Sequence, residues 1–489
     1  MSVEIERLAA ALRRAGLLVE ERGTMPARVA AVTDDSRLLR PGGLFVAVRG
    51  TDRDGHDYLD EVAERGASVA IVEDATRTTL PMLVVTDARR AAAIVASEAF
   101  GLPAEQLRLI GVTGTNGKTT TVGMLRHLLD EPGARAASIG TLGVRVGSAG
   151  EVLEGGAGLT TPGPVERQRV LRALVDFQGV RSVAMEVSSH SLDQRRVEGV
   201  GFDVGVFTNL TQDHLDYHRT MEAYLAAKAL LVAHLRPGGT AVVNADDAHW
   251  RALPAAPRTI RFGVTSPDAD VRALDVTYGA RGSDWVLQLG GERHAVRLPL
   301  IGSFNVENAL GAAAAAWAVG VAPATLADRM ATMPQVPGRL EILHEGPTVL
   351  RDYAHTPDAL ARALEAVRPF TRRDLILVFG CGGDRDRSKR PLMGEIAARG
   401  ADRIIVTSDN PRTEDPERIL DDIEAGMGGT AHERVEDRRE AIARAVELAG
   451  DGDVVLLAGK GHETYQIRGT TKLPFDERLI VHELMGRLS

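Results

Sequence analysis

Several features are scarce in this sequence, and each scarcity excludes some classes of function. The 489 residues contain one cysteine, Cys381, which excludes an internal disulfide and a cysteine-based metal site and fits a reducing cytoplasm. No long basic run occurs and the formal charge is −9, which argues against non-specific nucleic-acid binding. The longest apolar run, residues 309–322, is too short to cross a bilayer. We therefore expect a soluble cytoplasmic protein that binds small molecules rather than nucleic acid or membrane.

The strongest local signal is the stretch LIGVTGTNGKTTT, residues 109–121. Its apolar start predicts a buried strand and residues 119–129 predict a helix, so the glycines lie at a strand-to-helix turn. Such a turn lets backbone amides approach a phosphate. Lys118 would add a positive charge for the phosphates and Thr119 a hydroxyl for magnesium. Val112 occupies the position of the first glycine in the pattern G-x-x-x-x-G-K-[ST], which indicates a variant of the common phosphate-binding loop. The alternative is a plain glycine-rich turn with an exposed lysine.

The length and the order of apolar runs predict three α/β domains. Residues 1–106 form a small α/β domain. Residues 107–336 form a central P-loop mononucleotide-binding domain, in which strands alternate with helices and the sheet is largely parallel. Within it, the alternating pattern at residues 269–298 predicts an antiparallel hairpin. Residues 337–489 begin a new strand and helix alternation, which predicts a doubly wound, Rossmann-like domain.

Polar residues follow two of the predicted central strands, where a parallel sheet collects its ligands. Glu186 follows the strand at 182–185 and is well placed for magnesium; a capping or surface role is the alternative. A dense group of carboxylates and imidazoles follows the strand at 204–208 and suggests a metal or phosphate site, unless it is only a polar loop. This group consists of Asp213, His214, Asp216 and His218.

Ten motifs, in this order, resemble those of the Mur ligase family. They are TGTNGKTTT, MEVSSHSLDQRRV, TNLTQDHLDYH, the lysine of YLAAKALL, GSFNVENALGAAAAA, PGRLE, DYAHTPDAL, GCGGDRDRSKRPLMG, DNPR and AGKGHETYQ. The resemblance covers essentially the whole chain, and the family's phosphate loop has the glycine spacing seen here. It implies an ATP-dependent amino-acid ligase of peptidoglycan synthesis, with magnesium as cofactor and ATP as co-substrate.

The resemblance also implies where ATP and magnesium lie. The phosphates would bind to Gly114, Thr115, Asn116, Gly117, Lys118, Thr119 and Thr120. The adenosine would lie near Asn305, Asn308, Asp352 and His355. Magnesium would be held by Thr119, Glu186, His214 and Lys228, of which the last three together with Lys118 would be catalytic.

Lys228 carries the most specific chemical implication. In the family the matching lysine is carbamylated, which replaces an ammonium by a carboxylate-like group that suits magnesium. Without the resemblance, Lys228 would be interpreted as an ordinary solvated lysine on an alanine-rich helix. Cys381, by contrast, has no partnered base in the sequence and is interpreted as a small loop residue.

The two organic substrates are implied separately. A UDP-linked sugar dipeptide would contact Ser36, Thr160, Thr161, Ser188, Gln194 and Arg196. The sequence DNPR is the family's signature for members that add meso-diaminopimelate, whose second carboxylate an arginine can bind in a bidentate manner. The implied amino-acid site is Arg385, Asp409, Asn410, Arg412, Gly459 and Glu463.

The implied reaction activates the γ-carboxylate of D-glutamate as an acyl phosphate, which the amine of diaminopimelate then attacks. Three alternatives stay open: a lysine-adding member of the same family, a folylpolyglutamate synthase, and a P-loop switch or motor ATPase. The resemblance further implies a monomer.

Overall fold

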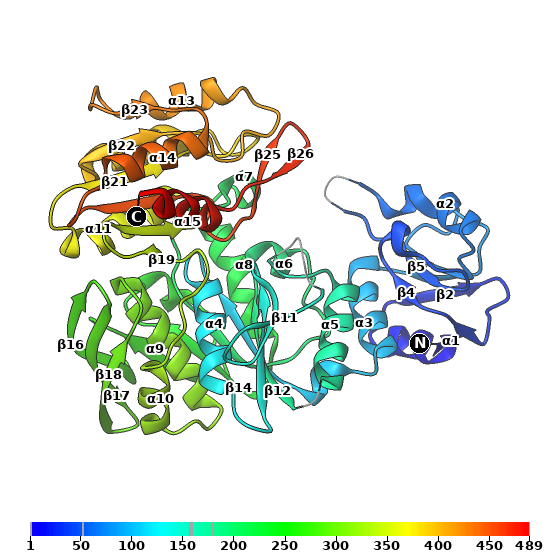
Figure 1. Cartoon of the computed structure of the whole chain (residues 1–489). Coiled ribbons are helices and arrows are strands. Elements are labelled where there is room, and N and C mark those ends of the chain that lie inside the picture. The colour runs from blue at the N-terminus through cyan, green and yellow to red at the C-terminus, as the bar shows by residue number, and fades with distance from the viewer. Residues whose placement is uncertain (1, 51–52, 156–159, 178, 489) are drawn as a thin grey trace.

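The computed structural model describes residues 2–50, 53–155, 160–177 and 179–488. They form three units in succession along the chain, each built on its own sheet (Figure 1). The three sheets lie within residues 18–85, 108–298 and 341–458. This confirms the predicted α/β class, whereas the domain limits at 106/107 and 336/337 stay a prediction.

The N-terminal unit has a five-stranded sheet in the order β2-β7-β6-β5-β4, in which β2 is antiparallel to β7 and the other neighbours are parallel. Successive apolar residues of a strand point to opposite faces. Helices therefore cover both faces of the sheet, and separate apolar cores lie on each. The elements are β1 (Val3–Glu4), α1 (Ile5–Arg14), β2 (Leu18–Arg22), β3 (Arg28–Val29), β4 (Val32–Thr33), η1 (Ser36–Leu38), β5 (Leu44–Val46), η2 (Gly55–Tyr58), α2 (Leu59–Glu64), β6 (Val69–Val72), β7 (Met82–Val85), α3 (Ala88–Ala99) and η3 (Pro103–Gln106).

The central unit has an eleven-stranded sheet in the order β11-β10-β9-β12-β8-β13-β14-β15-β16-β17-β18. The strands from β9 to β16 in this order are parallel, so their carboxyl ends meet at one edge. Its strands are β8 (Arg108–Thr113), β9 (Arg135–Gly140), β10 (Gly143–Val146), β11 (Glu151–Leu153), β12 (Val180–Glu186), β13 (Phe202–Phe207), β14 (Leu235–Asn244), β15 (Arg258–Gly263), β16 (Val271–Gly279), β17 (Gly282–Leu289) and β18 (Glu292–Leu298). Its helices are α4 (Lys118–Leu129), α5 (Pro164–Asp176), α6 (Ser189–Asp193), α7 (Leu215–His218), α8 (Met221–Ala233), η4 (Ala248–Ala252), α9 (Ser303–Ala318) and α10 (Pro323–Met330).

The predicted hairpin at residues 269–298 is wrong in its extent. This segment forms three antiparallel strands, β16, β17 and β18, and β16 pairs with β15, so the segment extends the central sheet. Trp285, Leu287 and Leu289 face the apolar core beneath α9 and α10. The period-two pattern identified the strands, but their partner β15 lies outside the segment.

The C-terminal unit has a six-stranded sheet in the order β19-β20-β24-β21-β22-β23, in which β19 alone of these strands is antiparallel to its neighbour. Helices cover both faces, as the doubly wound prediction required. The elements are β19 (Glu341–His344), β20 (Thr348–Asp352), α11 (Pro357–Val367), η5 (Arg368–Phe370), β21 (Leu375–Phe379), α12 (Lys389–Gly400), β22 (Arg403–Val406), α13 (Pro416–Glu424), β23 (Glu433–Arg434), α14 (Arg438–Leu448), β24 (Val454–Ala458), β25 (Tyr465–Arg468), β26 (Thr471–Pro474) and α15 (Glu477–Leu488).

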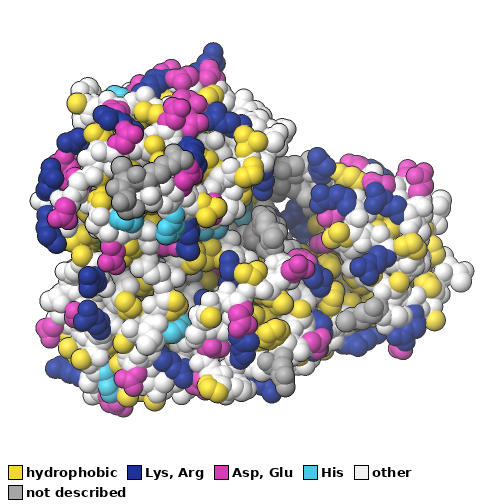
Figure 2. All heavy atoms as spheres, in the orientation of Figure 1, with side chains coloured by type: hydrophobic (Ala, Val, Ile, Leu, Met, Phe, Trp, Pro, Cys, Tyr) yellow, Lys and Arg dark blue, Asp and Glu magenta, His cyan; other side chains and the backbone are white. Residues whose placement is uncertain are grey.

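The surface carries both signs of charge. On the face seen in Figure 2, Lys and Arg side chains lie among Asp and Glu side chains over all three units. Among the described residues, no helix combines the length and the apolar character needed to span a membrane.

Candidate active site

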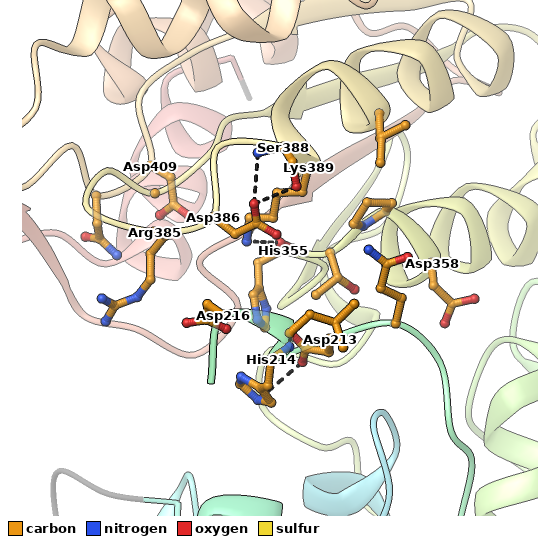
Figure 3. Close-up of a pocket in the computed structure, with 18 of the residues that line it drawn as sticks. Asp213, His214, Asp216, His355, Asp358, Arg385, Asp386, Ser388, Lys389 and Asp409 are labelled. Atoms are coloured by element: carbon orange, nitrogen blue, oxygen red, sulfur yellow. Dashed lines mark hydrogen bonds and ion pairs between the residues drawn. The ribbon is translucent and has the colours of Figure 1, made fainter. Parts of the chain in front are cut away.

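Two neighbouring cavities lie between the central and C-terminal units. The smaller cavity has a volume of about 270 Å³ and is lined in part by the loop between β8 and α4. The larger cavity has a volume of about 800 Å³ and is lined mainly by loops of the C-terminal unit. Figure 3 shows the larger cavity, with Asp213 and His214 on one side and Arg385 and Asp409 on the other. The cavities share four lining residues, Asp213, His214, Tyr353 and His355. Ligands in the two cavities can therefore contact the same four residues.

The loop from β8 to α4 has the predicted strand-turn-helix form, and its glycines are required by close contacts. Gly114 has φ +147°, and a Cβ placed there would lie 1.8 Å from Oγ1 of Thr208. Gly117 has φ +85°, and a Cβ there would lie 2.3 Å from Oδ1 of Asn308. Neighbouring side chains thus leave no room for a Cβ at these two positions, which explains why both are glycine.

Two lysines converge on one carbonyl of this loop. The Gly114 carbonyl accepts hydrogen bonds from Nζ of Lys118 at 2.9 Å and from Nζ of Lys228 at 2.7 Å. Lys228 is only 1% exposed, so its interpretation as a solvated lysine is wrong. Burial, reinforced by the charge of Lys118, lowers the pKa of Lys228 well below its ordinary value. Burial and the neighbouring ammonium therefore both disfavour the charged form of Lys228 at the phosphate loop.

Glu186 supplies a buried carboxylate close to Lys118. It ends β12 and is 1% exposed, and its side chain accepts hydrogen bonds from the Thr141 amide at 2.8 Å and the Thr141 hydroxyl at 3.2 Å. Burial raises the pKa of Glu186, while the Lys118 ammonium opposes that rise. The hydroxyl of Thr119 accepts a hydrogen bond from Arg339 at 3.1 Å, which brings the C-terminal unit onto the phosphate loop.

The histidines after β13 form an aromatic cluster with His190, which lies on α6 after β12. The ring of His190 lies 4.7 Å from that of His214 and 5.4 Å from that of His218. Burial lowers the pKa of His214, so its imidazole is neutral at neutral pH. Nε2 of His214 lies 3.3 Å from Asp213. Within the described residues, no group of three or more His, Cys, Asp or Glu side chains has an arrangement that could hold a metal. The role of the polar cluster after β13 stays a prediction.

Of the residues predicted to hold the nucleotide, all except Gly114 and Asn305 line the smaller cavity. The lining includes Thr115 to Thr120, Asn308, Asp352 and His355. Asn305 is buried and does not line the cavity. Its Nδ2 donates to the Ile301 carbonyl at 2.8 Å, and its Oδ1 accepts a hydrogen bond from Asn308 at 3.4 Å. Burial raises the pKa of Asp352 to about 6. Asp352 comes from the C-terminal unit, so the cavity closes only when that unit packs on the central one.

All six residues predicted for the amino-acid site line the larger cavity. They are Arg385, Asp409, Asn410, Arg412, Gly459 and Glu463. Arg412 has φ +53° and donates from NH1 to the Gly383 carbonyl at 2.7 Å. Asn410 donates to Glu463 at 2.9 Å. Loops after β21, β22 and β24 therefore meet here, although their residues are far apart in sequence.

The residues predicted for the sugar dipeptide are divided between places. Thr160 and Ser188 line the smaller cavity, and the buried Thr161 hydroxyl donates to the Glu186 carbonyl at 2.9 Å behind it. Gln194 and Arg196 line a third cavity of about 230 Å³ between the N-terminal and central units. Ser36, in η1, is not among the described residues that line these three cavities.

Several lining residues were not selected from the sequence. Tyr353 and Arg339 lie within motifs that were recognised, but only the fold shows that their side chains reach the smaller cavity. Lys389 lies in the larger cavity, and its Nζ donates to the His355 carbonyl at 2.7 Å. Asp358 accepts a hydrogen bond from Asn116 at 2.9 Å and joins the phosphate loop to α11. Cys381 is buried, and burial raises its pKa to about 12, which agrees with a non-nucleophilic role.

Comparison with protein families finds three matching models. Their descriptions are "Mur ligase family, catalytic domain" for residues 28–108, "Mur ligase middle domain" for residues 112–316 and "Mur ligase, glutamate ligase domain" for residues 338–461. Together they follow the order of the three units.

Comparison with individual proteins finds relatives of nearly the same length. A Geobacillus thermodenitrificans protein named UDP-N-acetylmuramoyl-L-alanyl-D-glutamate–2,6-diaminopimelate ligase is 46% identical over 465 residues, which cover 92% of this chain and 94% of that protein. A Synechococcus elongatus protein of the same name is 46% identical over 94% of this chain and 95% of its own length.

Comparison with solved structures finds proteins of similar fold. One described as a UDP-N-acetylmuramoyl-L-alanyl-D-glutamate–2,6-diaminopimelate ligase has a TM-score of 0.69 and 33% identity, and covers 100% of this chain and 99% of its own. A Mycobacterium tuberculosis folylpolyglutamate synthase complexed with ADP has a TM-score of 0.63 but 20% identity, and covers 76% of this chain and 91% of its own. The second likeness shows a shared fold only.

Proposed function

Because this chain belongs to the Mur ligase family, we propose that it joins meso-2,6-diaminopimelate to the D-glutamate γ-carboxylate of UDP-N-acetylmuramoyl-L-alanyl-D-glutamate at the expense of ATP. One observation carries the proposal. The six residues expected to bind the amino acid line a single cavity of about 800 Å³, which adjoins the phosphate loop. The amine and the ATP γ-phosphate can therefore reach the same wall, at Asp213 and His214.

ATP would bind in the smaller cavity. Its phosphates would lie on the amides from Gly114 to Thr120, with the adenosine between Asn308 and Asp352. Lys118 now donates to two loop carbonyls, at 2.9 and 2.8 Å. A bound phosphate offers this half-buried ammonium a charged partner, so we expect Lys118 to neutralise charge that develops on the γ-phosphoryl group.

The donor groups around the loop fit magnesium. A hydroxyl from Thr119, a carboxylate from Glu186 and, after carbamylation, oxygens from Lys228 are hard ligands of the kind that magnesium prefers together with substrate phosphates, and His214 lies beside them. Lys228 fits this role only as a carbamate, because an ammonium would repel the cation. Bound magnesium would neutralise phosphate charge.

In the first step the glutamate γ-carboxylate would attack the γ-phosphorus, forming an acyl phosphate and releasing ADP. Thr160 and Ser188 line the same cavity as the phosphate loop and would orient this acceptor, while Gln194 and Arg196 would hold the sugar-nucleotide part. In the second step the diaminopimelate amine attacks the acyl carbon, phosphate leaves, and the amide forms. Closure by Tyr353 and His355 would keep water from the acyl phosphate.

The amino-acid site would recognise both ends of diaminopimelate. Arg385 and Arg412 offer guanidinium groups for a carboxylate, and Asp409 and Glu463 offer carboxylates for an ammonium. Lysine lacks the distal carboxylate and would leave a guanidinium unpaired in the cavity, which disfavours it.

The test measures phosphate release and product mass with ATP and the UDP-linked dipeptide, adding diaminopimelate, lysine or neither. We expect turnover and a mass increase with diaminopimelate, and little turnover otherwise. Faster turnover with lysine would refute the amino-acid assignment. Phosphate release that is independent of any amino acid would instead indicate a switch or motor ATPase, and use of a folate acceptor would indicate a folylpolyglutamate synthase.

A further inference from the structure

Lys460 lies directly behind the wall of the larger cavity. It follows β24, is fully buried, and is not one of the residues that line the cavity. Its Nζ lies 3.4 Å from Oδ1 of Asp409, 3.1 Å from Oδ1 of Asn410 and 3.1 Å from Oε2 of Glu463. One ammonium thus contacts three of the six side chains proposed to bind the amino acid.

These contacts fix the orientation of the three side chains. Oδ1 of Asn410 also accepts the Ile467 amide at 2.9 Å, so its Nδ2 end faces Glu463, to which it donates at 2.9 Å. Oε2 of Glu463 therefore receives two donors. Among the described residues, none donates to Oε1 of Glu463, which leaves this oxygen available to a ligand. Lys460 thereby decides which atoms the cavity presents.

The same contacts set the local charge. Counted as two carboxylates and one ammonium, Asp409, Glu463 and Lys460 together have a formal charge of −1. A residual charge of this size suits one ligand ammonium. Without Lys460 the group would hold two adjacent carboxylates and would repel a ligand carboxylate bound to the neighbouring arginines.

Building on the proposed function, we propose that Lys460 is a positioning residue that sets the charge of the amino-acid site and thereby its preference for an amino acid with a second carboxylate. Diaminopimelate has no net charge at neutral pH, whereas lysine carries one positive charge. Removing the buried cation therefore favours lysine relative to diaminopimelate. The role is electrostatic, since Lys460 acts through Asp409, Asn410 and Glu463 and does not line the cavity itself.

The experiment compares Lys460→Met with wild type in the full reaction, measuring kcat/KM for diaminopimelate and for lysine and KM for ATP. Methionine is unbranched and only one atom shorter than lysine, and it removes the charge. We expect the ratio of the two kcat/KM values, diaminopimelate over lysine, to fall at least tenfold, while KM for ATP changes less than twofold. Lys472→Met is the matched control, because Lys472 is an exposed lysine on β26 whose loss should leave the ratio unchanged.

Asp409→Asn changes the charge of the group in the direction opposite to Lys460→Met. It therefore tests the electrostatic role even when Lys460→Met does not fold. It removes a negative charge from the same group, so the diaminopimelate preference should rise. A preference that stays within twofold of wild type in the folded variants, or that moves in the same direction in both, would overturn the role of Lys460. Wild-type enzyme that uses neither amino acid would instead refute the proposed function.

Discussion

We predict that Lys228 forms a carbamate with dissolved carbon dioxide and that replacing Lys228 by methionine abolishes it. Carbamylation requires a neutral amine. An ordinary lysine with a pKa of about 10.4 is only about 0.4% neutral at pH 8. Lys228 is buried on α8 and lies beside the Lys118 ammonium, and both effects lower its pKa. Each unit of lowering raises the neutral fraction about tenfold, up to a limit of roughly 250-fold at this pH.

The surroundings also favour the product. A carbamate retains one N–H, which can still donate to the Gly114 carbonyl that Nζ of Lys228 now contacts at 2.7 Å. Its negative charge would replace repulsion from Lys118 by attraction. At about 4–6 Å and an effective dielectric constant near 20, that exchange of sign is worth several kcal/mol. The modification therefore removes the electrostatic conflict that the unmodified side chains contain.

The assay is carbon-13 NMR of the protein equilibrated with labelled bicarbonate, together with activity measured before and after carbon dioxide is removed. Wild type should show one carbamate signal and lose activity reversibly on depletion. Lys228→Met should lack the signal and most activity. The sequence contains only five lysines, of which Lys472 is exposed, so Lys472→Met is a simple control that should keep the signal. A wild-type spectrum without this signal, with full activity in depleted buffer, would refute the reasoning.

Three further predictions concern single residues. Arg412→Ala should lower kcat/KM for diaminopimelate roughly 30- to 150-fold, since a charge-assisted pairing is worth about 2–3 kcal/mol, with KM for ATP within twofold; equal losses for both substrates in steady-state kinetics would contradict it. Gly117→Ala should weaken ADP binding at least ~10-fold by calorimetry, because its Cβ would meet Asn308, whereas Gly133→Ala, at a similar φ but in open space, should not. Burial raises the pKa of Asp352 to about 6, so its ionised form destabilises the fold above that pH and the penalty fades as pH falls below 6. In urea unfolding, the free energy of unfolding of Asp352→Asn should therefore exceed that of wild type by about 2–3 kcal/mol at pH 8 and by less at pH 5. An equal difference between variant and wild type at both pH values would contradict this.

Local patterns predicted the phosphate loop well. The apolar run before the glycines and the helix after them correspond to β8 and α4, and the helix start differs by one residue from the expected range. Both features depend on residues close together in sequence. The six residues of the amino-acid cavity were assigned through family resemblance, because no local pattern connects Arg385 to Glu463.

Burial of charged side chains was the main feature that the sequence did not reveal. Lys228 lies in a helix that is apolar on almost every face, so periodicity could not decide whether the lysine pointed inward. Lys460 follows a buried strand in a glycine-rich turn, where an exposed lysine is the ordinary expectation. The Gly114 carbonyl that Lys228 contacts, and the Asp409 and Asn410 side chains that Lys460 contacts, lie in loops far away in sequence, and only the packed fold brings them together.

The loop after β13 makes the two cavities one functional unit. Thr115 donates its amide to the Asn209 carbonyl at 2.7 Å and its hydroxyl to the Thr211 carbonyl at 3.1 Å. Two residues later the same loop supplies Asp213 and His214, the wall common to both cavities. A phosphate that orders the loop from β8 to α4 would therefore also order the surface on which the incoming amine meets the acyl phosphate. We therefore predict that a bound nucleotide strengthens binding of the amino acid, because the wall common to both cavities follows a segment that is hydrogen-bonded to the phosphate loop.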